Sequence, residues 1–311
     1  MTESAEFPSP PVIAEAQIQQ CRDSGDFSPV LFEWYKYVAI IANFFASLRQ
    51  DSPAVRKIAH PHYAALIGSL NRCTRLMHSN VALSHEGLFG ETTAILDRCI
   101  FETSVRIAWL CRQRSEEAFT RYFAEGLKTE LALKARITAN VTARGTGELE
   151  IEHRMLGSIQ RCIQTSGLTD AQIEESKNLP NLASMIESMR HDRLMYIVGQ
   201  KIGSHHVHGT WPGLLFHYLD RDDDGTWHPR DHNSPTHVNQ YVFVPLVVLS
   251  AVKAFIEFVF DAADDVAALS GIVESIQQEI VAINHEVVGT DFELAEEISL
   301  GRTPRCQSKT T

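Results

Sequence analysis

The most apolar stretch of the chain runs from Tyr241 to Phe260, and it limits what the other segments can pack against. Its length suits either a membrane span or the central helix of a helical domain. Lys253 and Glu257 lie inside it, and two charges in so short a span would be costly in lipid. We therefore predict a helix that is buried inside the protein and makes no membrane contact.

Helix signals recur along most of the remaining sequence. Ser28 followed by Pro29 is an N-cap with proline at the first helical position. A helix that begins near residue 180 is predicted to end at Gly203, where glycine suits a left-handed cap. Residues 220–239 are rich in aspartate and histidine and are predicted to form a polar loop. No alternating pattern of useful length predicts a strand.

These signals predict an all-α fold. We expect a single bundle-like helical domain over residues 11–290, with about nine to eleven helices, because no linker of domain-boundary length interrupts it. The proline-rich residues 1–10 are predicted to be a flexible tail, and residues 291–311 a disordered one. The apolar helices also supply enough hydrophobic surface to allow a homo-oligomer.

Charge and cysteine usage narrow the function classes. The net charge of -11 argues against a general surface for nucleic acid or for anionic membranes, although it leaves a local basic pocket open. Six cysteines are scattered without the close pairs that zinc sites and disulfide frameworks use, so we expect a cytoplasmic protein. The sequence has no glycine-rich phosphate loop, and we expect no cofactor.

Titratable residues concentrate in two places. Eight of the fourteen histidines lie between His191 and His237, including a Ser204-x-x-x-His208 segment that follows Tyr196. Histidine titrates near neutral pH and can act as a general acid or base. Earlier in the chain, Arg98 and Glu102 lie one helical turn apart in an apolar setting, where buried charges need partners.

The same two motifs resemble the bacterial "domain of unknown function 5677" family over roughly residues 60–265. Arg98 and Glu102 match its R-x-x-x-E motif, and Tyr196, Ser204 and His208 match its S-x-x-x-H segment after a tyrosine. The resemblance implies an all-helical fold and a distant likeness to HEPN-type (higher eukaryote and prokaryote nucleotide-binding) ribonucleases. A shared fold does not by itself fix a function.

Two functions remain open at these motifs. The first is metal-independent cleavage of a phosphodiester such as RNA, in phage defence or a toxin system, with His208 as general acid/base and Arg98 stabilising phosphate charge. Glu102 would then orient Arg98, while Tyr196 or Ser204 would hydrogen-bond near His208. The alternative is a non-catalytic scaffold or sensor for a partner protein, in which the same residues form a buried structural network.

Metal binding is a further alternative at two places. The run from Asp220 to Asp231 resembles the first half of a calcium loop, but it has aspartate at the twelfth position and Pro229 inside. His205, His208 and His217 could ligate a divalent transition metal if the fold placed a carboxylate such as Glu102 next to them. The sequence supplies no complete ligand set at fixed spacing, so we predict no metal site.

Overall fold

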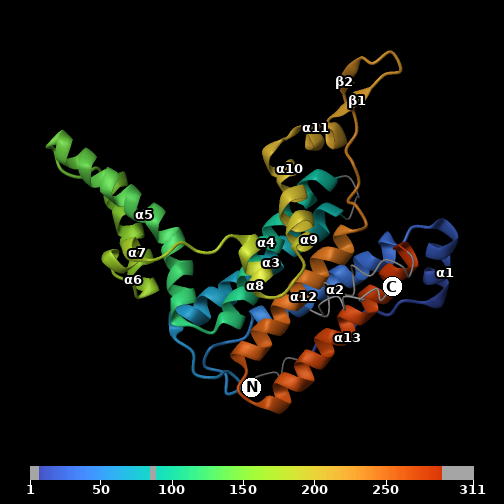
Figure 1. Ribbon diagram of the computed structural model, residues 1–311, viewed down its shortest axis with the longest axis horizontal. Coiled ribbons are helices and arrows are strands. Elements are labelled where there is room, and N and C mark those ends of the chain that lie inside the picture. Colours follow the sequence, from blue (N-terminus) through green and yellow to red (C-terminus); the bar gives the residue numbers. More distant parts are fainter. Residues whose placement is uncertain (1–6, 85–88, 289–311) are drawn as a thin grey trace, which may run out of the picture. The chain divides into compact units, whose positions relative to one another are not determined.

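The computed structural model describes residues 7–84 and 89–288, and these residues are mostly helical (Figure 1). The all-α prediction is confirmed. The chain divides into two compact units, of which the first comprises Met1–Lys57, Leu66–Arg112 and Leu182–Thr311, and the second Ile58–Ala65 and Gln113–Asn181. No glycine- or proline-rich linker marks this division, and the sequence accordingly predicts one continuous helical domain.

Most elements belong to the first unit. They are α1 (Glu15–Ser24), α2 (Ser28–Ala46), α3 (His60–Ser84), α4 (Gly90–Gln113), α8 (Leu182–Ser188), α9 (Arg193–Tyr196), the π-helix η1 (Ile197–Ile202), α10 (Gly203–His208), α11 (Trp211–His217), β1 (Leu219–Arg221), β2 (Trp227–Pro229), α12 (Gln240–Val259) and α13 (Ala263–Val288). The second unit holds α5 (Glu116–Arg144), α6 (Glu150–Ser166), α7 (Asp170–Glu175) and the first residues of α3.

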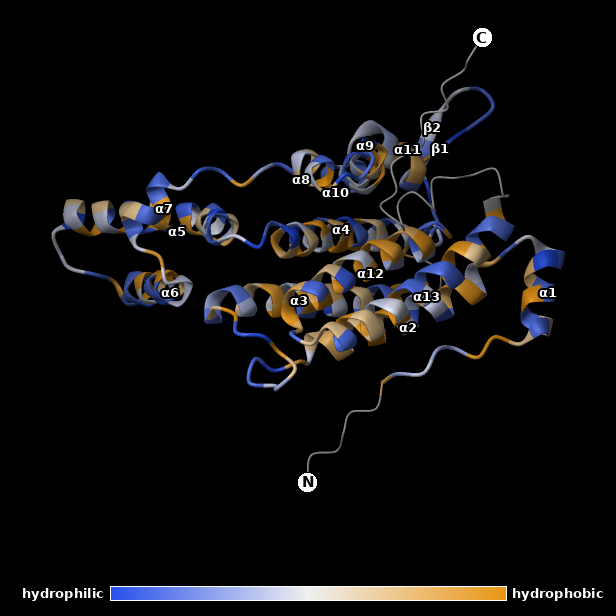
Figure 2. Cartoon of the chain, turned by 60° about the horizontal axis from the view of Figure 1, so that its bottom comes forward, coloured by the Kyte–Doolittle hydropathy of each residue, from blue (hydrophilic) through white to orange (hydrophobic). Residues whose placement is uncertain are grey.

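The core of the first unit forms around α12, the helix predicted from the apolar run. It packs against α2 and α13, and Figure 2 shows hydrophobic residues, in orange, along it. Phe255 and Ile256 are fully buried, and Phe243 stacks on Phe101 of α4 with ring centroids 5.6 Å apart. Among the described residues, α12 and α13 are long and apolar enough to cross a membrane, and 72% of the apolar window of α12 is buried inside the protein.

Three local expectations are wrong. The helix predicted from about residue 180 is interrupted between α8, which ends at Ser188, and α9, which begins at Arg193. Gly203 has a right-handed φ of -57° and does not end the second of these helices, which continues through the π-turn of η1 to His208. The left-handed cap is Gly209, with φ 55°. Within the predicted loop at 220–239, Leu219 pairs with Pro229 and Arg221 with Trp227 in a short antiparallel hairpin, which a tight turn at Gly225 makes possible.

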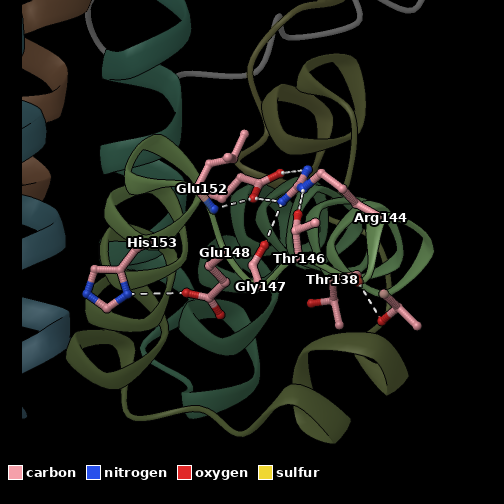
Figure 3. Close-up of polar contacts among 9 residues, drawn as sticks. Thr138, Arg144, Thr146, Gly147, Glu148, Glu152 and His153 are labelled. Atoms are coloured by element: carbon pink, nitrogen blue, oxygen red, sulfur yellow. Dashed lines mark hydrogen bonds and ion pairs between the residues drawn. The ribbon is translucent and has the colours of Figure 1, made fainter.

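The second unit is a helical hairpin with its own small core. Ala124, Leu127 and Ile137 of α5 pack with isoleucines of α6 and α7. An arginine clamp fixes the turn between α5 and α6 (Figure 3), since both terminal nitrogens of Arg144 donate to the two carboxylate oxygens of Glu152, at 3.0 and 2.5 Å. Arg144 also donates to the Thr146 hydroxyl and the Gly147 carbonyl. Each of the three guanidinium nitrogens of Arg144 therefore takes part in the clamp.

Candidate functional site

One face of α4 carries the charged residues of the site. Glu91, Arg98 and Glu102 are spaced by seven and four residues, which places them along one side of the helix. Arg98 Nη2 lies 3.1 Å from Glu102 Oε1, and the two side chains are only 15% and 26% exposed. Arg98 Nε is buried and has no hydrogen-bond partner. The ion pair predicted from the sequence therefore forms, but it leaves one donor unused.

The segment from α8 to α10 runs antiparallel across this face. A Cβ added to Gly203 would lie 3.1 Å from Cβ of Arg98, and one added to Gly199 would lie 2.5 Å from the Phe101 ring. Further along, Arg112 donates to the carbonyl of Met189 at 3.1 Å. These contacts fix the register, and glycine at 199 and 203 lets the two backbones approach closely. The π-helix η1 lies in this contact region, and π-helices are frequent at functional sites.

Two histidines meet beside α4. His206 follows Gly203 by one helical turn, so it shares the inward face, and its ring lies 4.9 Å from that of His217. Nδ1 of each imidazole is buried and has no hydrogen-bond partner. Burial lowers the pKa of both rings below the usual 6.5, and Glu91 acts in the opposite direction on each. The neighbouring charges of His217 and Arg230 further lower the pKa of His206 and of His217, respectively.

A polar cleft opens next to this pair. It has a volume of about 170 Å³ and is lined by Glu91, His217, Tyr218, Arg230 and His232 among others. A hydrogen bond to the Glu91 carboxylate raises the pKa of Tyr218 to about 12. Arg230 is fully engaged, because it donates to Asp220 and to the carbonyls of Phe216 and Leu219. Arg230 therefore holds the base of the hairpin in place.

The structure brings together some of the residues predicted from sequence. Arg98, paired with Glu102, lies against Gly203 at the start of the histidine segment. The Ser204 hydroxyl donates to the carbonyl of Gln200 at 2.6 Å, within its own helix. The Tyr196 ring lies under the Lys201 ammonium at 5.8 Å. His208 is exposed and makes no hydrogen bond or ion pair with any described residue, so its catalytic role stays a prediction.

The sequence did not single out three of the residues that lie in or next to the cleft. Glu91 and Tyr218 belong to neither motif, and His206 received no role. One sequence signal does point to them. Glu91 precedes Arg98 by seven residues, and His206 follows the two glycines at helical spacing.

Larger hollows lie elsewhere in the molecule. One of about 560 Å³ lies between α12 and α13, where Lys253 and Glu274 pair with each other at 2.5 Å. Another, of about 670 Å³, lies beside α5 in the second unit and is lined mainly by alanine and threonine. Within residues 7–84 and 89–288, no three histidine, cysteine, aspartate or glutamate side chains are placed to hold a metal ion.

Fold and site together define an all-helical protein in which Glu91 of α4 acts electrostatically on His206 of α10 and His217 of α11. The chain belongs to a family of unknown function, DUF5677, which matches residues 63–226. The match contains the charged face of α4, the glycine contacts and both histidines, whereas the cleft residues from Arg230 to Ser234 lie beyond it. No curated protein and no solved structure matches the chain.

Proposed function

We propose that the chain is an acid–base enzyme in which His206 and His217 form the catalytic pair, and that it cleaves RNA without a metal. The observation that carries the proposal is the pairing of two half-buried imidazoles, 4.9 Å apart, beside a polar cleft. Protonating one ring disfavours protonation of its neighbour, so such a pair holds a single proton in the pH range between its two pKa values. One ring is then a base while the other is an acid.

The singly protonated pair matches the needs of RNA transesterification. The neutral imidazole takes the proton of the 2′-hydroxyl as the bond from its oxygen to phosphorus forms. The protonated imidazole gives its proton to the 5′-oxygen as the phosphorus–oxygen bond breaks. The products are a 2′,3′-cyclic phosphate and a 5′-hydroxyl, and the enzyme's proton count is unchanged. RNA is favoured because it supplies its own nucleophile.

Arg98 is the group proposed to stabilise charge on the phosphate. It packs on Gly203, one helical turn before His206, and its Nε is buried without a partner. Glu102 holds the other side of the guanidinium and therefore orients it. We propose that the protein works in the cytoplasm, because the scattered cysteines suit a reducing environment.

The test is cleavage of labelled single-stranded RNA by the full chain in the presence of EDTA. The native protein should release products with cyclic phosphate ends, and His206→Ala and His217→Ala should each lower the rate by about 10²–10⁴-fold. His153→Ala is the control, since this exposed histidine belongs to α6 of the second unit. Equal rates in the native protein and the two cleft variants would refute the proposal.

The His208→Ala variant decides between two assignments of the catalytic histidine. If His208→Ala is inactive while His206→Ala and His217→Ala remain active, His208 is the catalytic histidine, as the sequence motif predicts. We expect the opposite result. We also expect the rate to be greatest below pH 6.5, since both pKa values of the cleft pair lie below that value.

A non-catalytic scaffold is the second candidate, and the Arg98–Glu102 ion pair packed on Gly203 is the observation that favours it. A scaffold predicts that Arg98→Met lowers the melting temperature by many degrees and that no RNA is cleaved. The enzyme predicts loss of cleavage with little change in melting temperature. Measuring both quantities on the same variant separates the two candidates.

A further inference from the structure

The exposed apolar side chains gather in one part of the first unit. Among the described residues, fifteen large hydrophobic side chains are exposed, and eight of them lie between Leu194 and Trp227. Phe216 is 67% exposed and Trp211 56%. Clustered exposure of this kind marks interaction surfaces on proteins. We call the exposed side chains of α9 to β2 the aromatic face.

The aromatic face contains a tryptophan pair. The rings of Trp211 on α11 and Trp227 on β2 lie 5.8 Å apart in an edge-to-face arrangement. The Arg221 guanidinium lies 5.4 Å from the Trp227 ring. Tryptophan, tyrosine and arginine are the residue types that dominate binding energy at interfaces. Because Arg230 anchors the base of the hairpin to α11, these rings are held in a fixed arrangement.

The two ends of the aromatic face carry opposite charge. At the α9 end, Arg190, Arg193 and Lys201 are exposed, and the only acid among them, Asp192, caps the Leu194 amide. At the other end, the turn between β1 and β2 carries three consecutive aspartates, residues 222–224. Figure 1 shows α9 and this turn at opposite ends of the region, with α10 and α11 between them.

We infer that the aromatic face is a two-fold interface between two copies of this chain. In a two-fold dimer each copy presents the same patch, rotated by half a turn. The basic α9 end of one copy then meets the acidic turn of the other, and the exposed apolar side chains between the two ends meet around the axis. A nucleic acid would be repelled by the three aspartates, and a uniformly charged protein would match only one end.

Two exposed groups make the charge match specific. Arg193 and Asp223, at opposite ends of the face, form no ion pair with any described residue of their own chain. Their charges are therefore available to a second copy. Tyr218 is part of the aromatic face and also lines the cleft, so the partner copy would border the cleft entrance.

Sedimentation of the full chain at low ionic strength, over a wide concentration range, tests the interface. We expect a dimer whose dissociation constant rises about tenfold or more in Trp211→Ala and in Trp227→Ala. Ile151→Ala is the matched control, because this residue is also exposed but lies on α6 of the second unit. A native protein that stays monomeric, or a dimer that is insensitive to both tryptophan changes, would overturn the inference.

Charge reversal tests the two-fold arrangement with variants that remove no apolar contact. Asp223→Lys and Arg193→Glu should each weaken the dimer, and the double variant should restore it, with unchanged circular dichroism in all three. A double variant as weak as the single ones would contradict a two-fold match. Monomeric native protein that binds polyuridylate through the tryptophans would show that a nucleic acid occupies the face instead.

Discussion

Two arginine–glutamate pairs in different parts of the molecule are built in different ways. Arg144 in the α5–α6 turn bonds both oxygens of Glu152, a hydroxyl and a carbonyl. Arg98 on α4 makes one contact with Glu102 and leaves its Nε buried without a partner. All three guanidinium nitrogens of Arg144 have partners, whereas one donor of Arg98 has none, so we call the Arg144 pair the closed pair and the Arg98 pair the open pair. The open pair packs on Gly203, one helical turn before His206, and the closed pair holds a turn.

The largest loss of stability is expected when a side chain is added at Gly199, where η1 and α4 are in close contact. A Cβ at Gly199 would overlap the ring of Phe101, which is buried and stacked on Phe243 and cannot move away easily. Gly199→Ala should therefore cost about 1–3 kcal/mol of unfolding free energy. Gly68→Ala in α3 is the control, since nothing lies near its added Cβ, and it should stabilise by about 0.5–1 kcal/mol. Urea unfolding of both variants measures the difference, and equal effects would refute the close packing.

Breaking the closed pair should have the next largest effect. Arg144→Met should lower the melting temperature by several degrees and speed hydrogen exchange in the α5–α6 turn, because four hydrogen bonds are lost. Arg144 lowers the pKa of Glu152 below its usual 4.5, so this stabilisation is present above that pH and is lost as the pH falls through the folded-state pKa. The difference from the native protein should therefore shrink in acid. Arg98→Met should leave the turn unchanged.

The contribution of Asp97, the buried residue that precedes Arg98 in the sequence, should depend on pH in the opposite direction. Asp97 accepts a hydrogen bond from Asn80 at 2.5 Å, and its other oxygen is buried without a partner. Burial raises the pKa of Asp97 well above 3.8, so its contribution to stability is full below that pH and is lost as the pH rises through the folded-state pKa. Asp97→Asn should stabilise by about 1 kcal/mol or more at neutral pH and less in acid. Melting curves at several pH values test this, and a destabilised variant at pH 7 would be inconsistent with an uncompensated carboxyl.

The smallest effects are expected on the outer face of α10. Ser204 bonds only within its helix, and His208 is exposed without a hydrogen bond to any described residue. Ser204→Ala and His208→Ala should each change the unfolding free energy by no more than about 0.5 kcal/mol. A loss of several kcal/mol in either variant would mean that the motif residues are structural, and it would weaken the contrast with the inward-facing His206.

The sequence predicts the helical class, the buried α12 and the Arg98–Glu102 pair, because each depends on spacing within one helix. The histidine pair depends on contacts between helices. The π-turn of η1 rotates the residues that follow it, so regular helical spacing from Tyr196 does not show which histidine faces inward. Likewise His217 reaches His206 only because α11 packs closely on α10, where a Cβ at Gly213 would lie 2.6 Å from the His205 carbonyl oxygen. No local pattern encodes that approach.

Histidine titration by NMR tests the central claim most directly, because it needs no substrate. The resonances of His206 and His217 can be assigned from the spectra of the His206→Gln and His217→Gln variants. Both imidazoles should titrate below 6.5, and Glu91→Gln should lower both pKa values further, since the carboxylate raises each of them. Titration of either ring at or above 6.5, or no response of either ring to Glu91→Gln, would contradict a coupled acid–base pair on the α4 face.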